Sequence, residues 1–241
     1  MVSVRGLSQS FGDRKVLDHI DLEVPKGGIV AIMGSSGGGK TTLLRCISGL
    51  LEPTEGKVFV DDIDVHAKPD EARRHMGMVF QGAALFDYMT VWENVMFGLK
   101  RLQKGKHEEL EVRAREALKM VGLEKAEKQM PSELSGGMRK RAGLARALVL
   151  QPAVMLYDEP TTGLDPVTTY TIDQLMVKVN RQGITSLIVS HDLTSVVRVA
   201  EKVAFLHEGR IVYEGEPSGM AKSGVPAIEE LIRASQSTTA L

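Results

Sequence analysis

Apolar and polar residues alternate in the segment from Val16 to Val24. Positions 16, 20, 22 and 24 are apolar, whereas positions 19, 21 and 23 are polar. A period of two is typical of a strand that buries only one face. The turn-forming residues Pro25–Gly28 follow. The uninterrupted apolar run Ile29–Met33 then predicts a strand that is buried on both faces.

Further along the chain, short apolar runs alternate with segments of helical periodicity. After the first run, apolar residues recur near helical spacing at Leu43, Leu44, Ile47 and Leu50. Three more runs predict strands, at Gly56–Val60, Ala153–Tyr157 and Ser186–Val189. The helix between the last two strands is predicted over Thr168–Arg181. Because strands that alternate with helices form parallel sheets, we expect a mainly parallel sheet in an α/β fold.

Residues 81–150 have a different pattern, which predicts a helical insertion in this α/β domain. One helical face collects the apolar residues Leu110, Ala114, Ala117, Leu118 and Val121. Gly122 follows as a plausible helix stop.

The C-terminal segment predicts an amphipathic helix over Pro226–Ala234. Its apolar residues Ile228, Leu231 and Ile232 fall near helical spacing. The apolar face of such a helix packs either on its own domain or on a partner chain. Residues 234–241 predict a loose tail.

The composition narrows the class of protein. The 241 residues include 43% apolar and 25% charged residues, which allows a substantial core. The length suits one large domain or one domain with an inserted subdomain. The formal net charge of -1 provides no overall attraction to nucleic acid or anionic lipid. A single cysteine, Cys46, excludes an internal disulfide framework and fits a reducing compartment.

Membrane segments are not predicted either. The first residues lack the apolar core of a signal peptide, and no stretch approaches the roughly 18 consecutive apolar residues that a membrane span needs. We therefore expect any role at a membrane to depend on a partner.

A glycine-rich segment between the strand at Ile29–Met33 and the following helix matches the phosphate-binding pattern G-x-x-x-x-G-K-[ST]. Glycines let backbone N–H groups approach phosphate oxygens, and the next helix presents its positive N-terminal end. Lys40 can reach the β- and γ-phosphates, and the Thr41 hydroxyl can coordinate Mg²⁺. We expect the phosphates to be held by Gly34, Ser35, Ser36, Gly37, Gly38, Gly39, Lys40, Thr41 and Thr42. The motif alone does not separate kinases, GTPases, helicases and transport ATPases.

Two carboxylates, Asp158 and Glu159, follow the buried strand Ala153–Tyr157. Asp158 can support Mg²⁺ directly or through water, and Glu159 is then placed to polarise an attacking water. The alternative is a solvated acidic turn before Pro160, which the upstream phosphate motif makes much weaker.

A second anion-binding segment is predicted at Ser135, Gly136 and Gly137, at the start of a helical run. A chain with one phosphate loop does not need a second phosphate site for its own nucleotide. It needs one if two copies pack head to tail, so that each nucleotide lies between the two chains. The alternative is an N-cap followed by an ordinary surface helix.

These motifs resemble those of the ABC ATPase family. Leu134–Gly137, followed by Arg139–Arg141 and Ala145–Leu148, looks like the family's signature segment. The resemblance implies a P-loop NTPase fold with a mainly parallel core sheet, an N-terminal antiparallel β-subdomain and an inserted α-helical subdomain. It also implies a head-to-tail homodimer that uses ATP and Mg²⁺.

The remaining family elements occur in order along the chain. Gln81 resembles the residue that senses Mg²⁺ and the attacking water. Asp165 resembles the aspartate that crosses the dimer interface, and His191 resembles the histidine that contacts the γ-phosphate. Phe11 resembles the aromatic residue that stacks on adenine. The implied RecA-like core, with its β-subdomain, spans residues 1–80 and 153–225. The helical subdomain spans 81–152, and 226–241 forms a C-terminal helix and tail.

A closer resemblance is to the MlaF-like ATPases of Mla/Mce-type phospholipid transporters. It rests on Phe80–Phe86, Thr90–Val95, Met130–Met138 and Tyr157–Pro166. It implies an integral-membrane permease, an Mce-domain lipid-binding protein, a small cytoplasmic regulatory subunit and a place at the cytoplasmic face of the inner membrane. ATPases of polar amino-acid importers have similar sequences and are the alternative within this class.

Two alternatives of another class were weighed. A soluble ABC ATPase that acts on nucleic acid or ribosomes usually carries two ATPase domains, a coiled-coil insert or a zinc module, whereas this chain has one phosphate motif and one cysteine. A regulator that binds ATP without hydrolysis is disfavoured because Gln81, Glu159 and His191 are all present. The basic cluster Arg139–Arg141 predicts a solvated helix face rather than a nucleic-acid contact.

Overall fold

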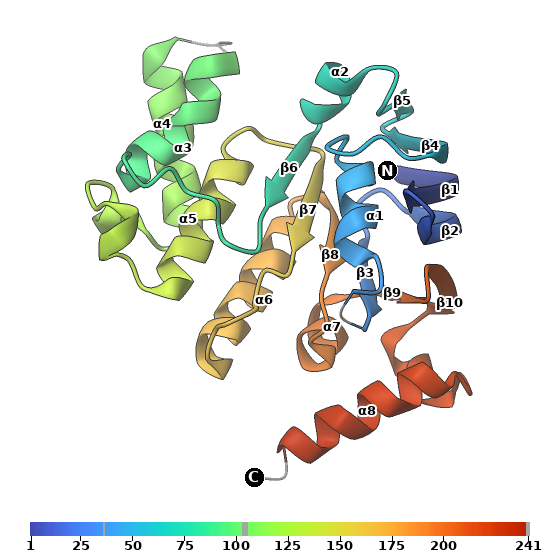
Figure 1. Cartoon of the computed structure of the whole chain (residues 1–241). Helices are drawn as coiled ribbons and strands as arrows, with labels where there is room; N and C mark the ends of the chain where they lie inside the picture. The colour runs from blue at the N-terminus through green and yellow to red at the C-terminus, as the bar shows by residue number, and fades with distance from the viewer. Residues whose placement is uncertain (36, 103–105, 240–241) are drawn as a thin grey trace.

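The computed structural model describes residues 1–35, 37–102 and 106–239, which form two sheets and their covering helices (Figure 1). The first sheet is antiparallel and has the order β2-β1-β4-β5. Its strands are β1 (Val2–Phe11), β2 (Arg14–Val24), β4 (Glu55–Val60) and β5 (Ile63–Asp64). This sheet confirms the antiparallel N-terminal sheet that the family resemblance implies.

The second sheet has the order β10-β9-β3-β8-β7-β6, and only its β9–β10 pair is antiparallel. Its strands are β3 (Ile29–Gly34), β6 (Met76–Val79), β7 (Val154–Asp158), β8 (Thr185–Val189), β9 (Lys202–His207) and β10 (Arg210–Gly215). Every residue of β3, β7 and β8 is buried, which explains why these strands read as continuous apolar runs. The mainly parallel core sheet is confirmed.

Two hydrophobic clusters lie on opposite faces of this parallel sheet. Along β3, Ile29, Ala31 and Met33 join one cluster, whereas the alternating residues Val30 and Ile32 join the other. The period of two sends successive side chains to opposite faces, so one strand serves both clusters. The central strand that ends in the phosphate loop is therefore fixed from both sides.

The helices fall into two groups along the chain. Those that pack with the sheets are α1 (Lys40–Ile47), α2 (Pro69–Arg73), α6 (Pro166–Asn180) and α7 (Leu193–Val199), with the 3-10 turn η3 (Pro217–Lys222). A separate group lies beyond the β6 edge and comprises α3 (Val91–Leu102), α4 (His107–Met120) and α5 (Gly136–Leu148), with the 3-10 turns η1 (Glu124–Ala126) and η2 (Pro131–Glu133) (Figure 1). This group confirms the predicted helical insertion.

The C-terminal helix α8 (Pro226–Thr239) is longer than the pattern predicted. Ile228 is fully buried, and Leu231 and Ile232 pack against the main core, so the helix packs on its own domain. The predicted loose tail from residue 234 is wrong as far as Thr239, because no glycine or proline interrupts the helix that Ile228 anchors. Residues 240–241 lie outside the described part of the chain.

Helix α6 also begins two residues earlier than predicted. The Asp165 carboxylate accepts hydrogen bonds from the backbone N–H groups of Val167 and Thr168, each at 3.0 Å. Asp165 is therefore the N-cap, and Pro166 occupies the first helical position, where its missing N–H costs nothing. The sequence carried this signal, because an Asp-Pro pair is a typical helix start.

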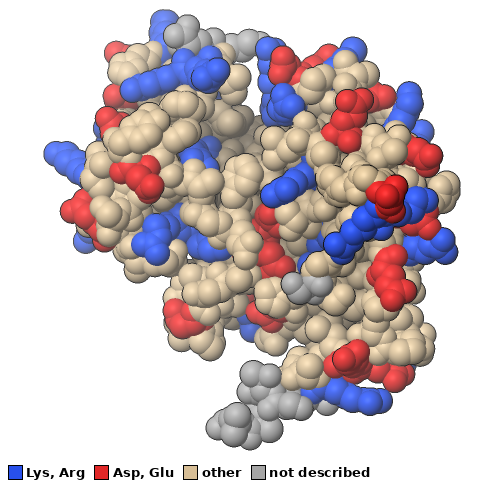
Figure 2. All heavy atoms as spheres, in the orientation of Figure 1, with Lys and Arg blue, Asp and Glu red and all other residues tan. Residues whose placement is uncertain are grey.

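Charged side chains of both signs are interspersed on the face shown in Figure 2, without a single-sign region that spans it. This arrangement agrees with the balanced composition. In the described residues, no helix is both long and apolar enough to cross a membrane.

One buried side chain, Asn94 of α3, fixes the segment before that helix. Its amide oxygen accepts from the Phe86 N–H at 2.8 Å, and its amide nitrogen donates to the carbonyls of Phe86, Met89 and Thr90 at 3.0–3.1 Å. We expect Asn94→Ala to lower the free energy of unfolding by about 2–4 kcal/mol, since it leaves several inward-facing backbone groups unpaired. Thermal and denaturant unfolding measure this loss, with the exposed Tyr88→Ala as the control.

Candidate active site

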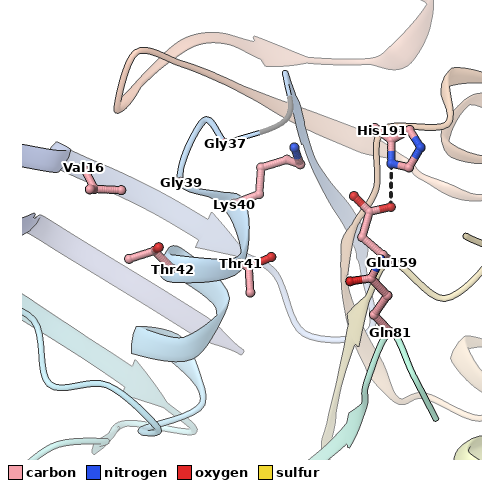
Figure 3. A pocket seen from close by; sticks show the side chains of 9 residues that line it. All are labelled: Val16, Gly37, Gly39, Lys40, Thr41, Thr42, Gln81, Glu159 and His191. Atoms are coloured by element: carbon pink, nitrogen blue, oxygen red, sulfur yellow. Dashed lines mark hydrogen bonds and ion pairs between the residues drawn. The ribbon is translucent and has the colours of Figure 1, made fainter.

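The C-terminal ends of four parallel strands bring the predicted catalytic side chains to one edge of the core sheet. The phosphate loop follows β3, Gln81 follows β6, Glu159 follows β7 and His191 follows β8. Ligands of open α/β sheets bind at this edge. A cleft of about 380 Å³ lies there, lined by Val16, Gly37, Gly39, Lys40, Thr41, Thr42, Gln81, Glu159 and His191 (Figure 3).

The phosphate loop is built from glycines that no other residue could replace without strain. At Gly34 the backbone φ is +148°, and an added Cβ would lie 2.1 Å from the carbonyl oxygen of Leu206. At Gly39, the N-cap of α1, φ is +98° and an added Cβ would lie 2.8 Å from the Leu17 side chain. The loop can therefore approach a ligand with its backbone, as a phosphate-binding segment requires. Ser36, which was predicted to belong to this loop, lies outside the described residues.

Lys40 begins α1, and its ammonium stays with the loop. Its Nζ donates to the carbonyl oxygens of Gly34 at 2.9 Å and Ser35 at 2.8 Å. Burial lowers the pKa of Lys40, and the nearby charges of Glu159 and Asp158 oppose that change. The ammonium thus lies between the phosphate loop and the two carboxylates.

Thr41 lines the cleft, and Asp158 lies directly behind it. The Thr41 hydroxyl donates to Asp158 Oδ1 at 3.3 Å. Burial raises the pKa of Asp158, while the bond from Thr41 lowers it. Hydroxyl, carboxylate and amide oxygens are the ligands that Mg²⁺ prefers, so Thr41, Asp158 and the cleft-lining Gln81 fit this ion.

Glu159 is held in one orientation by neighbours on three segments. Its backbone has a left-handed φ of +48°, and its N–H donates to the carbonyl of Val189 at 2.9 Å. Its Oε2 accepts from the Thr162 hydroxyl at 2.9 Å and lies 2.7 Å from Nδ1 of His191. A carboxylate and an imidazole in hydrogen-bond contact can orient a water and hold its proton, and both face the cleft opposite Lys40 (Figure 3).

The predicted second anion site does not line this cleft among the described residues. Ser135 is the N-cap of α5, and its hydroxyl accepts from the Met138 N–H at 3.3 Å. Gly136 and Gly137 form the first turn of that helix. These contacts fit the capping alternative, and the hypothesis that a second copy uses the same residues stays a prediction. The same holds for Asp165, whose carboxylate caps α6 of its own chain.

Phe11 ends β1 and is 51% exposed, so its side chain is accessible at the surface. The described lining of the cleft contains Val16 of β2 in its place. Sequence reasoning missed Val16, because a single apolar residue in an alternating strand is the usual sign of a core position. The stacking role of Phe11 stays a prediction.

The basic cluster Arg139–Arg141 is only partly the solvated helix face that was predicted, because Arg139 is exposed but the next two residues contact backbone carbonyls. Lys140 is 7% exposed, and its Nζ donates to the carbonyl oxygens of Gln81 and Glu159. Arg141 donates to the carbonyls of Val121 and Gly122. The prediction is wrong for Lys140 and Arg141 because these carbonyls lie at segment ends, where no helix or sheet ladder supplies a donor. A charge run in the sequence carries no sign of such acceptors.

A family model described as ABC transporter matches residues 17–162. The glutamine transport ATP-binding protein GlnQ of Escherichia coli is 42% identical over 226 residues, covering 92% of this chain and 94% of that protein. The probable ribonucleotide transport ATP-binding protein mkl of Mycobacterium leprae is 38% identical over 236 residues, covering 96% and 68%.

Solved structures agree with this likeness. A dimeric structure of a post-hydrolysis state of the ATP-binding cassette MJ0796, bound to ADP and Pi, superposes with a TM-score of 0.82. Its sequence is 35% identical, and the match covers 90% of this chain and 99% of that one. The predicted fold class is therefore confirmed.

Proposed function

Because this chain belongs to the ABC transporter family as an ATPase subunit that uses ATP and Mg²⁺, we propose that the cleft at the edge of its core sheet is the hydrolytic site. One observation carries the assignment of residues. The Glu159–His191 pair, 2.7 Å apart, faces Lys40 and Thr41 across the cleft (Figure 3).

The side chains divide the work of phosphoryl transfer. Lys40 and the backbone of the phosphate loop hold the β- and γ-phosphates, and Thr41 and Asp158 hold Mg²⁺ with Gln81. When bound, the metal ion would neutralise part of the phosphate charge. Glu159 takes the proton of the attacking water, and His191 fixes the carboxylate and contacts the γ-phosphate. All of these residues except Asp158 line the cleft, and Asp158 reaches it through Thr41.

The active form is proposed to be a head-to-tail homodimer. The relative MJ0796 is described as dimeric with bound ADP and Pi. In this chain Ser135 begins α5 with an exposed side chain, and Asp165 begins α6 in the same way. The exposed N-terminus of α5 is suited to receive phosphate from another copy, whereas the Asp165 carboxylate at the start of α6 is suited to a polar contact across the interface. ATP binding would then close the dimer, and hydrolysis would reopen it.

Replacing Ser135 by arginine tests this composite site. We expect Ser135→Arg to keep ATP binding by one chain within about two-fold and to abolish ATP-driven dimerisation, because a bulky cation replaces the hydroxyl at the helix start. Analytical ultracentrifugation with ATP, in a Glu159→Gln background that stops turnover, measures the dimer fraction. Ser218→Arg, at an exposed position in η3, is the matched control. A normal dimer fraction for Ser135→Arg would exclude the head-to-tail arrangement.

A membrane permease is the proposed partner, and the surface around α3 is the proposed contact. Tyr88 is 74% exposed, and it lines a shallow groove with Met89, Glu93, Phe97, Lys100 and Arg101. Exposed aromatic residues with a basic rim are typical of protein contacts. The chain would then lie at the cytoplasmic face of the inner membrane.

The proposed cargo is phospholipid or a related hydrophobic molecule, with an Mce-domain protein and a small cytoplasmic regulatory subunit as further partners. The resemblance of residues 80–86 and 90–95 to Mla/Mce-type ATPases supports this cargo, since these residues adjoin the proposed permease surface. A second candidate is import of a polar solute such as an amino acid. It is favoured by the 42% identity to a glutamine transport protein.

Affinity capture distinguishes the two cargoes. The tagged full chain is purified from detergent-solubilised native membranes, and the bound proteins and lipids are identified by mass spectrometry. Recovery of an Mce-domain protein with a multispanning permease and phospholipid supports lipid transport. Recovery of a permease with a solute-binding protein overturns the lipid cargo and supports import.

A further inference from the structure

Lys140 is a buried lysine that connects three segments of the active site. It lies on α5, the helix that Ser135 begins, and it is 7% exposed. Its Nζ donates to the backbone carbonyl of Gln81, in the segment between β6 and α3, and to that of Glu159 at 3.1 Å. One ammonium group thus joins the signature helix to the two segments that carry the predicted water-handling side chains.

Burying this charge is costly, and the surroundings only partly offset the cost. Burial lowers the pKa of Lys140, whereas the charges of Glu159 and Asp158 raise it. A methionine would fill a similar volume without desolvating a charge. The charged group nevertheless lies against two backbone carbonyls, those of Gln81 and Glu159, to which it donates.

The Glu159 carbonyl is a specific target for such a donor. Its residue has a left-handed backbone φ of +48°, which a non-glycine residue keeps only when its surroundings hold it. Its N–H donates to the Val189 carbonyl at 2.9 Å, and its C=O accepts from Lys140 at 3.1 Å and, over the longer distance of 3.4 Å, from the Thr162 N–H. The position of the Glu159 side chain therefore depends on an ammonium carried by the helical insertion.

We propose that Lys140 is a positioning residue for ATP hydrolysis, which transmits movement of α5 to Gln81 and Glu159. When α5 shifts with the helical insertion, its ammonium shifts the backbone that carries both side chains. The nucleophilic water is then correctly placed in only one position of α5. This inference rests on the proposed roles of Gln81 and Glu159 in hydrolysis.

Arg141, the next residue, provides a matched control. It is also a basic residue of α5 that donates to two backbone carbonyls, those of Val121 at 2.9 Å and Gly122 at 3.2 Å. Both of these carbonyls belong to the helical insertion itself, just after α4. Losing Arg141 therefore weakens packing within the insertion and leaves the link to Glu159 in place.

The test compares Lys140→Met with Arg141→Met in the full chain. Hydrolysis is measured on the complex captured with the tagged chain from its native membranes, and ATP affinity is measured on the purified chain. We expect Lys140→Met to lower kcat about 10- to 100-fold, because this factor corresponds to the free energy of lost hydrogen bonds from a charged group. The ATP dissociation constant should stay within about two-fold of the parent. Arg141→Met should leave kcat within about two-fold. Lys140→Gln, which keeps a neutral donor, should fall between Lys140→Met and the parent.

Three outcomes overturn the proposal. They are a parental kcat for Lys140→Met, an equal loss in Arg141→Met, and a loss of ATP affinity that accounts for the loss of rate. If Lys140→Met does not fold, as judged by thermal unfolding, a parental kcat for Lys140→Gln overturns it. A Glu159→Gln variant is assayed in parallel. If that variant hydrolyses ATP at the parental rate, the proposed role of Glu159 fails first; if it is inactive while Lys140→Met is normal, only the role of Lys140 fails.

Discussion

Replacing Glu159 by glutamine should lower ATP turnover by about 10²- to 10⁴-fold, because a general base usually contributes a rate factor of this size. The affinity for ATP should stay within about two-fold of the parent. The amide keeps the size of the carboxylate and can still accept the Thr162 hydrogen bond through its oxygen. It cannot accept a proton from water. The variant should therefore hold ATP and remain in the closed dimer.

The measurement is phosphate release at saturating Mg-ATP, together with the dissociation constant for ATP and the dimer fraction. Glu208→Gln is the matched control, because Glu208 is an exposed glutamate whose backbone has nearly the same left-handed φ, +47°. A Glu159→Gln variant that turned over ATP at the parental rate would show that another group activates the water. Loss of ATP binding in that variant would mean that Glu159 acts on the nucleotide itself.

Much of the fold was predictable because the chain's periodicity follows burial closely. The strand Ile29–Met33 and the run Ala153–Tyr157 are apolar throughout, since both faces of the parallel sheet are covered. The phosphate motif was predictable for a related reason. Gly34 and Gly39 adopt conformations that side chains cannot share, so the spacing of these glycines is set by the loop geometry.

Lys140 was not predictable from the pattern, although it lies six residues beyond the recognised Leu134. Its burial depends on carbonyls of Gln81 and Glu159, which lie 59 and 19 positions away in sequence. A backbone carbonyl leaves no mark on the sequence, so a basic cluster looks the same whether it faces water or unpaired acceptors. The exposed cap positions Ser135 and Asp165 show the reverse limit. The sequence predicts that both residues begin helices. It does not distinguish a simple helix cap from an interchain contact, because the same residues serve both.

The second large effect is expected at Lys40. Replacing Lys40 by alanine should raise the dissociation constant for ATP by about 10²- to 10⁴-fold, because two charge-assisted hydrogen bonds to phosphate, each worth about 1.5–3 kcal/mol, are lost. The same ammonium donates to the Gly34 and Ser35 carbonyls, so its removal also releases the loop that presents its N–H groups. Both effects act on the β- and γ-phosphates and leave the adenine contact untouched.

Binding of AMP separates this phosphate effect from a general loss of structure. AMP lacks the two phosphates that Lys40 is proposed to hold, so the affinity for AMP should change by less than about three-fold in Lys40→Ala. The ratio of ATP affinity to AMP affinity should therefore fall by nearly the same factor as the ATP affinity. Lys26→Ala, at an exposed lysine in the turn before β3, is the control. Isothermal titration of both nucleotides makes the comparison. An equal loss for ATP and AMP would place the defect in the fold of the loop, and an unchanged ATP affinity would remove Lys40 from the phosphate site.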